Sequence, residues 1–262
     1  MTADGIDIDA LTVRYDDGPA VVESLDLTIG HGAFVALLGP SGCGKSTVLN
    51  SIAGFVRPSA GSVRFEGAVV TGPGRERGVV FQRDVLFPWA SVGSNIEFAL
   101  RAGKLGRGRR YTRVTELIRA VGLGADVISK LPHELSGGMR QRVGIARALA
   151  NGPRVLLMDE PFGALDALTR QQMQDLVIEL WERSKTTIVF VTHDVDEAIR
   201  IATSIVVMNR GGGIAAHLAN PLPRPRPASR LAEIDGYAAL RRRLHDLLRT
   251  DEYPVSLGEE TA

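Results

Sequence analysis

The sequence predicts an α/β fold with a mostly parallel sheet at its core, an antiparallel β subdomain and an inserted α-helical subdomain. Residues 34–38, 155–158 and 187–191 are apolar runs, typical of strands that are buried on both faces of a parallel sheet. Residues 6–65 also contain short runs with alternating apolar residues, which favour antiparallel strands. Helical periodicity dominates residues 92–149, which we therefore expect to form the helical insert.

The composition suits a folded protein and excludes several classes. Of the 262 residues, 44% are hydrophobic, and 31 Lys and Arg residues balance 30 Asp and Glu residues. The resulting net charge of +1 gives no general attraction to nucleic acid, which we do not expect as a partner. The acidic start and the shortness of the apolar runs predict a cytoplasmic chain that does not itself span a membrane. A single cysteine, Cys43, excludes an intrachain disulfide.

The first apolar run continues into Gly-Pro-Ser-Gly-Cys-Gly-Lys-Ser and then into a helix-like stretch, residues 47–53. This is the G-x-x-x-x-G-K-S/T pattern of a phosphate-binding loop, in its required place between a strand and a helix. Glycines let backbone N–H groups point at phosphates, and the helix N-terminus adds a partial positive charge. We expect Lys45 to reach the β- and γ-phosphates of ATP and Ser46 to bind Mg²⁺. The core is thus predicted to be a P-loop NTPase, with these nucleotide-binding residues: Gly39, Pro40, Ser41, Gly42, Cys43, Gly44, Lys45, Ser46 and Thr47.

The second apolar run, residues 155–158, ends in two carboxylates, Asp159 and Glu160. Open α/β sheets bind ligands at the carboxyl ends of their strands. Asp159 is a candidate ligand of Mg²⁺, directly or through water, and Glu160 can polarise the water that attacks the γ-phosphate. An isolated pair of this kind fits a solvated acidic turn equally well, but the phosphate-binding loop favours the functional interpretation.

The remaining elements complete the core and leave an appendage. Between the second and third apolar runs, residues 168–183 form an amphipathic helix. Beyond residue 210, three glycines and a Pro-rich stretch at residues 221–227 precede a helix expected near residues 229–249. Its leucines at positions 240, 244, 247 and 248 have helical spacing, so we expect it to dock on the protein. We divide the chain into an ATPase domain, residues 1–210, and a Pro/Arg-rich link with a C-terminal helix, residues 211–262.

Residues 135–139, Leu-Ser-Gly-Gly-Met, are followed by Arg-Gln-Arg-Val-Gly-Ile-Ala-Arg-Ala-Leu. Taken alone, this segment also fits an ordinary helix capped by Ser136, whose glycines leave N–H groups open to an anion. It resembles the LSGGQ signature of ATP-binding-cassette proteins, with Met139 in place of the final Gln. The resemblance covers nearly all of residues 6–210, with the motifs in the family's order.

The resemblance implies roles for further residues. Tyr15 matches the aromatic residue that stacks on adenine, and Gln82 matches the glutamine that contacts Mg²⁺ or the attacking water. His193 resembles the histidine that contacts the γ-phosphate, and residues 163–166, Gly-Ala-Leu-Asp, resemble the loop that communicates across a dimer. The implied catalytic residues are Glu160, His193, Gln82 and Lys45, and the implied metal ligands are Ser46, Gln82 and Asp159.

The resemblance also implies partners. In this family two cassettes pack head to tail around two ATP molecules, which places Ser136, Gly137 and Gly138 in the partner's site. Residues 85–89, Val-Leu-Phe-Pro-Trp, suit either a protein contact or core filling between subdomains. They resemble a segment that nitrate, sulfonate and taurine importers use near the coupling helices of their membrane subunits.

The sequence-based expectation is therefore an ATP-hydrolysing subunit of such an importer, located on the inner face of the cell membrane. Its expected partners are a second copy, two permease subunits and, indirectly, a solute-binding protein. The alternative is a soluble cassette ATPase that takes no part in transport.

Overall fold

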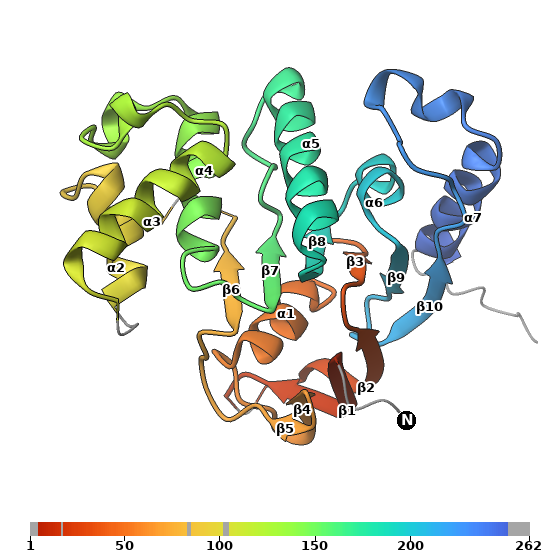
Figure 1. The fold of residues 1–262 in the computed structure, drawn as a ribbon. Helices are drawn as coiled ribbons and strands as arrows, with labels where there is room; N and C mark the ends of the chain where they lie inside the picture. Colours follow the sequence, from red (N-terminus) through yellow and green to blue (C-terminus); the bar gives the residue numbers. More distant parts are fainter. Residues whose placement is uncertain (1–4, 17, 83–84, 102–104, 251–262) are drawn as a thin grey trace, which may run out of the picture.

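The fold has three layers, with a mixed β-sheet in the middle (Figure 1). The computed structural model describes residues 5–16, 18–82, 85–101 and 105–250. The described part leaves out residues 1–4 and 251–262, which are the outer ends of the two predicted domains. It also leaves out residues 17, 83–84 and 102–104.

The middle layer is a six-stranded sheet with the order β10-β9-β3-β8-β7-β6. Strand β10 pairs antiparallel to β9, whereas the other pairs are parallel. Strands β3, β7 and β8 are the three apolar runs of the sequence, and layers on both sides cover them, which confirms the predicted fold class. The strands are β3 (Phe34–Leu38), β6 (Arg77–Val80), β7 (Val155–Asp159), β8 (Thr187–Thr192), β9 (Ser204–Met208) and β10 (Ile214–Ala219).

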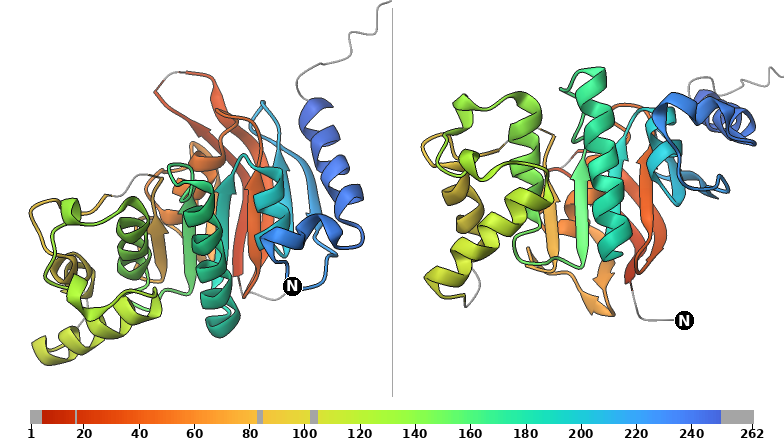
Figure 2. Two further views of the ribbon diagram at one scale, coloured as in Figure 1. Left: turned by 90° about the horizontal axis from the view of Figure 1, so that it is seen from above. Right: turned by 45° about the horizontal axis from the view of Figure 1, so that its top comes forward.

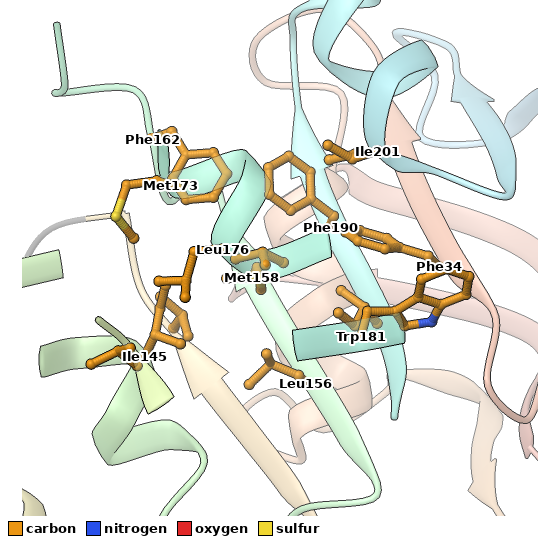
Figure 3. Close-up of a cluster of buried hydrophobic side chains, with 14 of the residues drawn as sticks. Phe34, Ile145, Leu156, Met158, Phe162, Met173, Leu176, Trp181, Phe190 and Ile201 are labelled. Carbon is orange, nitrogen blue, oxygen red and sulfur yellow. The ribbon is translucent and has the colours of Figure 1, made fainter. Parts of the chain in front are cut away.

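Successive side chains of β3 face different layers because side chains alternate along a strand. Phe34, Ala36 and Leu38 join the cluster beneath helices α5 (Ala167–Ser184) and α6 (Val195–Ile201). Figure 3 shows part of this cluster, where the rings of Phe34, Phe162, Phe190 and Trp181 gather between the sheet and α5. The intervening residues of β3 face helix α1 and the antiparallel layer.

The antiparallel layer lies on the other side of the main sheet, as predicted for the first part of the chain. Its strand order is β2-β1-β4-β5, and helix α1 packs between it and the main sheet. These elements are β1 (Gly5–Arg14), β2 (Ala20–Gly30), α1 (Lys45–Ala53), β4 (Ala60–Phe65) and β5 (Ala68–Val69).

Three α-helices and two short 3₁₀ turns lie beyond β6, at the opposite end of the molecule from α7 (Figure 2). Among the helices in the described part of the chain, none combines the length and the hydropathy that a membrane span requires. The elements beyond β6 are α2 (Val92–Arg101), α3 (Arg107–Ala120), η1 (Ala125–Val127), η2 (Pro132–Glu134) and α4 (Gly137–Ala148).

The C-terminal region differs from its prediction in two ways. Strand β10, which adds to the edge of the main sheet, was not predicted. The prediction of a single helix near residues 229–249 was wrong, because η3 (Ala228–Glu233) and α7 (Tyr237–Thr250) are separate elements. Gly236 lies between them and has φ +83°, a backbone conformation that an L-residue rarely adopts. As expected, α7 docks on the protein, and Leu240 and Leu244 are buried.

Candidate functional site

The phosphate-binding loop folds around its own lysine. The loop joins β3 to α1, and Gly44 within it has φ +94°. A Cβ added to Gly44 would lie only 2.8 Å from the carbonyl oxygen of Val21, so no larger residue fits there. Lys45 is only 5% exposed, and its Nζ donates hydrogen bonds to the carbonyl oxygens of Gly39 at 2.8 Å and Pro40 at 2.7 Å. Cys43 is buried beneath the loop, and burial raises the pKa of its thiol. The ammonium group thus lies inside the curve where the pattern places phosphates.

Ser46 and Asp159 meet although they are far apart in the sequence. The Ser46 hydroxyl donates to Asp159 Oδ1 at 2.8 Å. Burial raises the pKa of the Asp159 carboxyl, the bond from Ser46 opposes this rise, and the nearby charge of Glu160 adds to it. A hydroxyl and a carboxylate are oxygen ligands of the kind that Mg²⁺ prefers, and a dication would offset the repulsion between the two carboxylates. The residues therefore fit a magnesium ion.

Two of the three other predicted catalytic side chains, Gln82 and His193, meet at Glu160. Its Oε2 accepts a hydrogen bond from Gln82 Nε2 at 3.3 Å, and His193 Nδ1 lies 3.3 Å from the same oxygen. The Glu160 side chain is 21% exposed and that of His193 is 61% exposed, so the pair opens toward solvent. Glu160 has φ +40°, and its backbone N–H donates to the carbonyl oxygen of Val191 at 3.1 Å. Tertiary contacts thus hold a strained residue at the end of β7, as is common at functional sites.

Tyr15 lies beside the start of α1. Its hydroxyl and that of Thr47 are 3.3 Å apart, and the side chain is 49% exposed. A half-exposed aromatic ring beside the phosphate-binding loop can stack on a planar base.

The signature segment is separate from the phosphate-binding loop in the described part of the chain. Ser136 caps α4 as predicted, its Oγ accepting a hydrogen bond from the Met139 N–H at 3.3 Å. Ser136 and Gly137 are exposed. In the described part of the chain, no hydrogen bond or ion pair joins residues 136–138 to the loop at residues 39–46.

The sequence did not predict that Glu197, on the helix that follows His193, is a buried carboxylate. Asp194 followed three residues later by Glu197 is a capping-box pattern, in which the glutamate side chain returns to the N-cap backbone N–H. Here the Thr192 hydroxyl accepts that N–H at 3.0 Å, and Glu197 turns inward instead. Glu160 and Glu197 both line a cavity of about 50 Å³ near the carboxyl ends of β7 and β8.

The comparisons with known proteins agree with this geometry. The family model described as "ABC transporter" matches residues 22–163. The taurine import ATP-binding protein TauB of Rhizobium johnstonii is 48% identical over 204 residues, which cover 78% of each chain. TauB of Yersinia pestis is 46% identical over 208 residues, covering 79% of this chain and 81% of that protein.

A solved dimer of the ATP-binding cassette MJ0796, bound to ADP and Pi, has a TM-score of 0.72 at 30% identity. It covers 82% of this chain and 98% of its own. The nucleotide-binding geometry and these similarities agree on ATP as the ligand and on its hydrolysis as the reaction. The chain therefore belongs to the ABC transporter family, as one of its ATP-binding subunits that hydrolyse ATP.

Proposed function

We propose that the chain is the energy-coupling subunit of an importer for a small sulfonate of the taurine type. It acts as a homodimer with two permease subunits, which hold it at the inner face of the membrane, and a solute-binding protein delivers the solute. The observation that carries the solute class is the 48% and 46% identity to two proteins named for taurine import. Because these relatives are import subunits, we do not propose the alternative outside transport.

The proposed binding step exchanges contacts of Lys45. Its Nζ leaves the carbonyl oxygens of Gly39 and Pro40 and donates to the β- and γ-phosphates, while the loop's N–H groups surround them. Tyr15 stacks on the adenine. Ser46, Asp159 and Gln82 would hold Mg²⁺, which would neutralise phosphate charge.

In the proposed hydrolytic step, Glu160 orients and deprotonates the water that attacks the γ-phosphate. His193 and Gln82, each 3.3 Å from Glu160 Oε2, orient that carboxylate and contact the γ-phosphate and the water. The exposure of His193 supports a role toward a ligand that arrives from solvent.

The exposed signature supports a site shared between two copies. The helix N-terminus at Ser136, Gly137 and Gly138 can donate N–H groups to a γ-phosphate, but among the described residues of one chain no hydrogen bond joins it to the phosphate-binding loop. We therefore infer that each ATP lies between the loop of one subunit and the signature of the other. ATP would close the dimer, and hydrolysis would release it.

An apolar groove is the proposed docking site of the permease. It has a volume of about 670 Å³, and its lining includes Phe55, Phe81, Val85, Phe87 and Phe98. Phe55 and Phe98 are 49% and 57% exposed, and these rings suit a short amphipathic helix of a partner. Trp89, 78% exposed, lies next to the groove's aromatic wall, with its ring 5.6 Å from that of Phe87.

Residues of the groove are linked to Glu160 in the ATP site and to α4, the helix that begins at the signature segment. Phe81 lines it, and the next residue, Gln82, reaches Glu160. Arg147 on α4, the helix that begins at the signature, donates to the carbonyl oxygen of Val85 at 2.9 Å and lies over the Phe87 ring. A partner seated in the groove would therefore press on the water-activating carboxylate and on the signature helix together.

The proposed function is tested by uptake in the organism that encodes this chain. Removing the gene is expected to abolish import of radiolabelled taurine while leaving import of labelled nitrate unchanged. Wild-type protein restores uptake, whereas Glu160→Gln, which keeps the shape of the site but loses the base, does not. Normal taurine uptake without the gene would refute the solute class. Failure of tagged wild-type protein to copurify any polytopic protein from membranes would refute the importer.

A further inference from the structure

A chain of buried hydrogen bonds runs from the interior of α5 and α6 to the turn that carries His193. Arg200, 3% exposed, donates through Nη1 to Gln174 Oε1. Gln174 Nε2 donates to Glu197 Oε1 at 2.8 Å, and the Thr192 hydroxyl donates to Glu197 Oε2 at 2.5 Å. The Asp194 N–H donates to Thr192 Oγ1 at 3.0 Å, which brings the chain to the residue after His193.

The donors at the two ends of this chain of hydrogen bonds are fixed by their chemistry. A guanidinium group can only donate, so Gln174 must present its oxygen to Arg200 and its NH₂ group to Glu197. A backbone N–H also can only donate, so the Thr192 oxygen accepts from Asp194, and the Thr192 hydroxyl donates its own hydrogen to Glu197 Oε2. Donors therefore converge on Glu197 from both sides, and only a carboxylate accepts on both oxygens.

The other end of the chain is firmly anchored. Arg200 also pairs with Asp175 on α5, and its Nε donates to the carbonyl oxygen of Arg226 at 3.3 Å. Arg226, itself buried, donates to the carbonyl oxygens of Ile199 at 2.9 Å and Ala202 at 2.7 Å. The side of Glu197 away from the turn thus belongs to a packed interior, so displacement at Glu197 passes to the turn at residues 192–194.

We propose that Glu197 is a positioning residue for ATP hydrolysis: through the Thr192 hydroxyl it fixes the turn that places His193 beside Glu160. This inference rests on the role of His193 in the proposed function. It explains why a carboxylate is buried at the first turn of α6 without capping that helix, whose cap is Asp194. Burial raises the pKa of the Glu197 carboxyl, and the bonds from Thr192 and Gln174 oppose that rise.

The test measures kcat and KM for ATP with purified full-length protein and three variants. Glu197→Gln keeps the shape of the side chain, but its NH₂ group would face one of the two donors that bond to Glu197, Gln174 Nε2 or the Thr192 hydroxyl. Thr192→Val removes that hydroxyl. Both are expected to lower kcat by about tenfold to a hundredfold with KM nearly unchanged, because a misplaced catalytic group affects the reaction rather than ATP binding. Thr192→Ser, which keeps the hydroxyl, restores most of the turnover.

Asp196→Asn is the matched control. Asp196 is the neighbouring carboxylate on α6, but it faces outward and accepts hydrogen bonds from Tyr237 and Arg241 at 2.7 Å each. Its variant is expected to retain the wild-type kcat. A kcat of Asp196→Asn that falls as far as that of Glu197→Gln would overturn the proposal, since any change to α6 would then suffice.

A double-mutant cycle with His193→Ala separates this inference from the proposed function. If Glu197 acts through His193, adding Glu197→Gln to His193→Ala lowers kcat no further. An equal loss in both backgrounds overturns the positioning role, as does wild-type kcat in Glu197→Gln or in Thr192→Val. If His193→Ala itself retains full activity, the proposed role of His193 fails first, and the inference fails with it. If Glu197→Gln does not fold, the comparison of Thr192→Val with Thr192→Ser decides the question. Of these two variants, only Thr192→Ser keeps the hydroxyl that bonds to Glu197.

Discussion

The phosphate-binding loop and the signature segment are both glycine-containing turns at a helix N-terminus, yet they differ in burial and in hydrogen bonding. At the start of α1, Gly44 is buried and Lys45 folds back on the loop's carbonyl oxygens. At the start of α4, Ser136 and Gly137 are exposed, and the cap is a hydroxyl bonded to the Met139 N–H. The lysine of the first turn bonds to its own loop, whereas the second turn exposes Ser136 and Gly137 to solvent. The difference favours a site in which the second turn meets a ligand bound to another copy.

The largest effect is expected at the buried turn. Lys45→Ala removes the one ammonium group inside the loop, so ATP hydrolysis should fall at least about 100-fold, as when a preorganised donor is lost from a catalytic site. Phosphate release measures turnover, and equilibrium binding of a fluorescent ATP analogue measures affinity. Lys130→Ala is the control, since Lys130 lies on the surface and pairs with Asp126 at 3.0 Å. Full turnover by Lys45→Ala would show that this loop does not hold the phosphates.

A mixing experiment sharpens the comparison by asking whether the two turns serve one ATP in trans. Ser136→Glu places a carboxylate where a phosphate should arrive, so this variant and Lys45→Ala should each be inactive. When they are mixed in equal amounts, half of the dimers contain one of each, with one intact loop facing one intact signature. Recovery of up to about a quarter of the wild-type rate is therefore expected. If the mixture stays inactive although the subunits exchange, each site is built within a single chain.

A smaller effect, on stability, is expected from the two signature glycines. A Cβ on Gly138 would lie 2.5 Å from Thr169 Cγ2, whereas a Cβ on Gly137 would meet nothing nearer than Arg140 Nη2 at 3.8 Å. Gly138→Ala should therefore cost about 1–3 kcal/mol of unfolding free energy through overpacking, while Gly137→Ala costs nothing measurable. Denaturant unfolding measures both.

Thr169→Ser removes the methyl group that a Cβ on Gly138 would touch. The double variant Gly138→Ala with Thr169→Ser should regain most of the lost stability, because the steric conflict is gone. Equal unfolding free energies for Gly137→Ala and Gly138→Ala would mean that the packing of α4 on α5 does not distinguish the two positions.

Much of this site could be predicted because its motifs are local. Lys45 and Ser46 follow a buried strand at fixed spacing, and Asp159 and Glu160 end another, so the parallel sheet brings them to one edge. The left-handed backbone of Glu160 could not be predicted, since a glutamate has no preference for φ +40° and only the surrounding contacts impose it.

Glu197 shows the limit of a local pattern. Its spacing from Asp194 predicts a capping box, but the Thr192 hydroxyl competes for the same N–H and wins, because Gln174 offers the glutamate a second donor from α5. That donor comes from 23 residues earlier in the sequence. Strand β10 escaped prediction for a related reason: its alternation in Ile-Ala-Ala-His-Leu-Ala is weak, and pairing with β9 decides its structure.

The smallest effect is expected at Met139, where the family signature has Gln. The Met139 backbone N–H bonds to Ser136 Oγ, and its side chain packs partly buried against the main core cluster. The anion-binding property of this helix N-terminus comes from backbone N–H groups, which Met139→Gln leaves in place. The rate of ATP hydrolysis should therefore change by less than about tenfold, the ceiling set by one ordinary hydrogen bond that the new amide can add. Steady-state phosphate release measures this. A larger gain would show that the amide contacts the nucleotide or the partner's loop, and the comparison between the two turns would then have to include a side chain as well as a backbone.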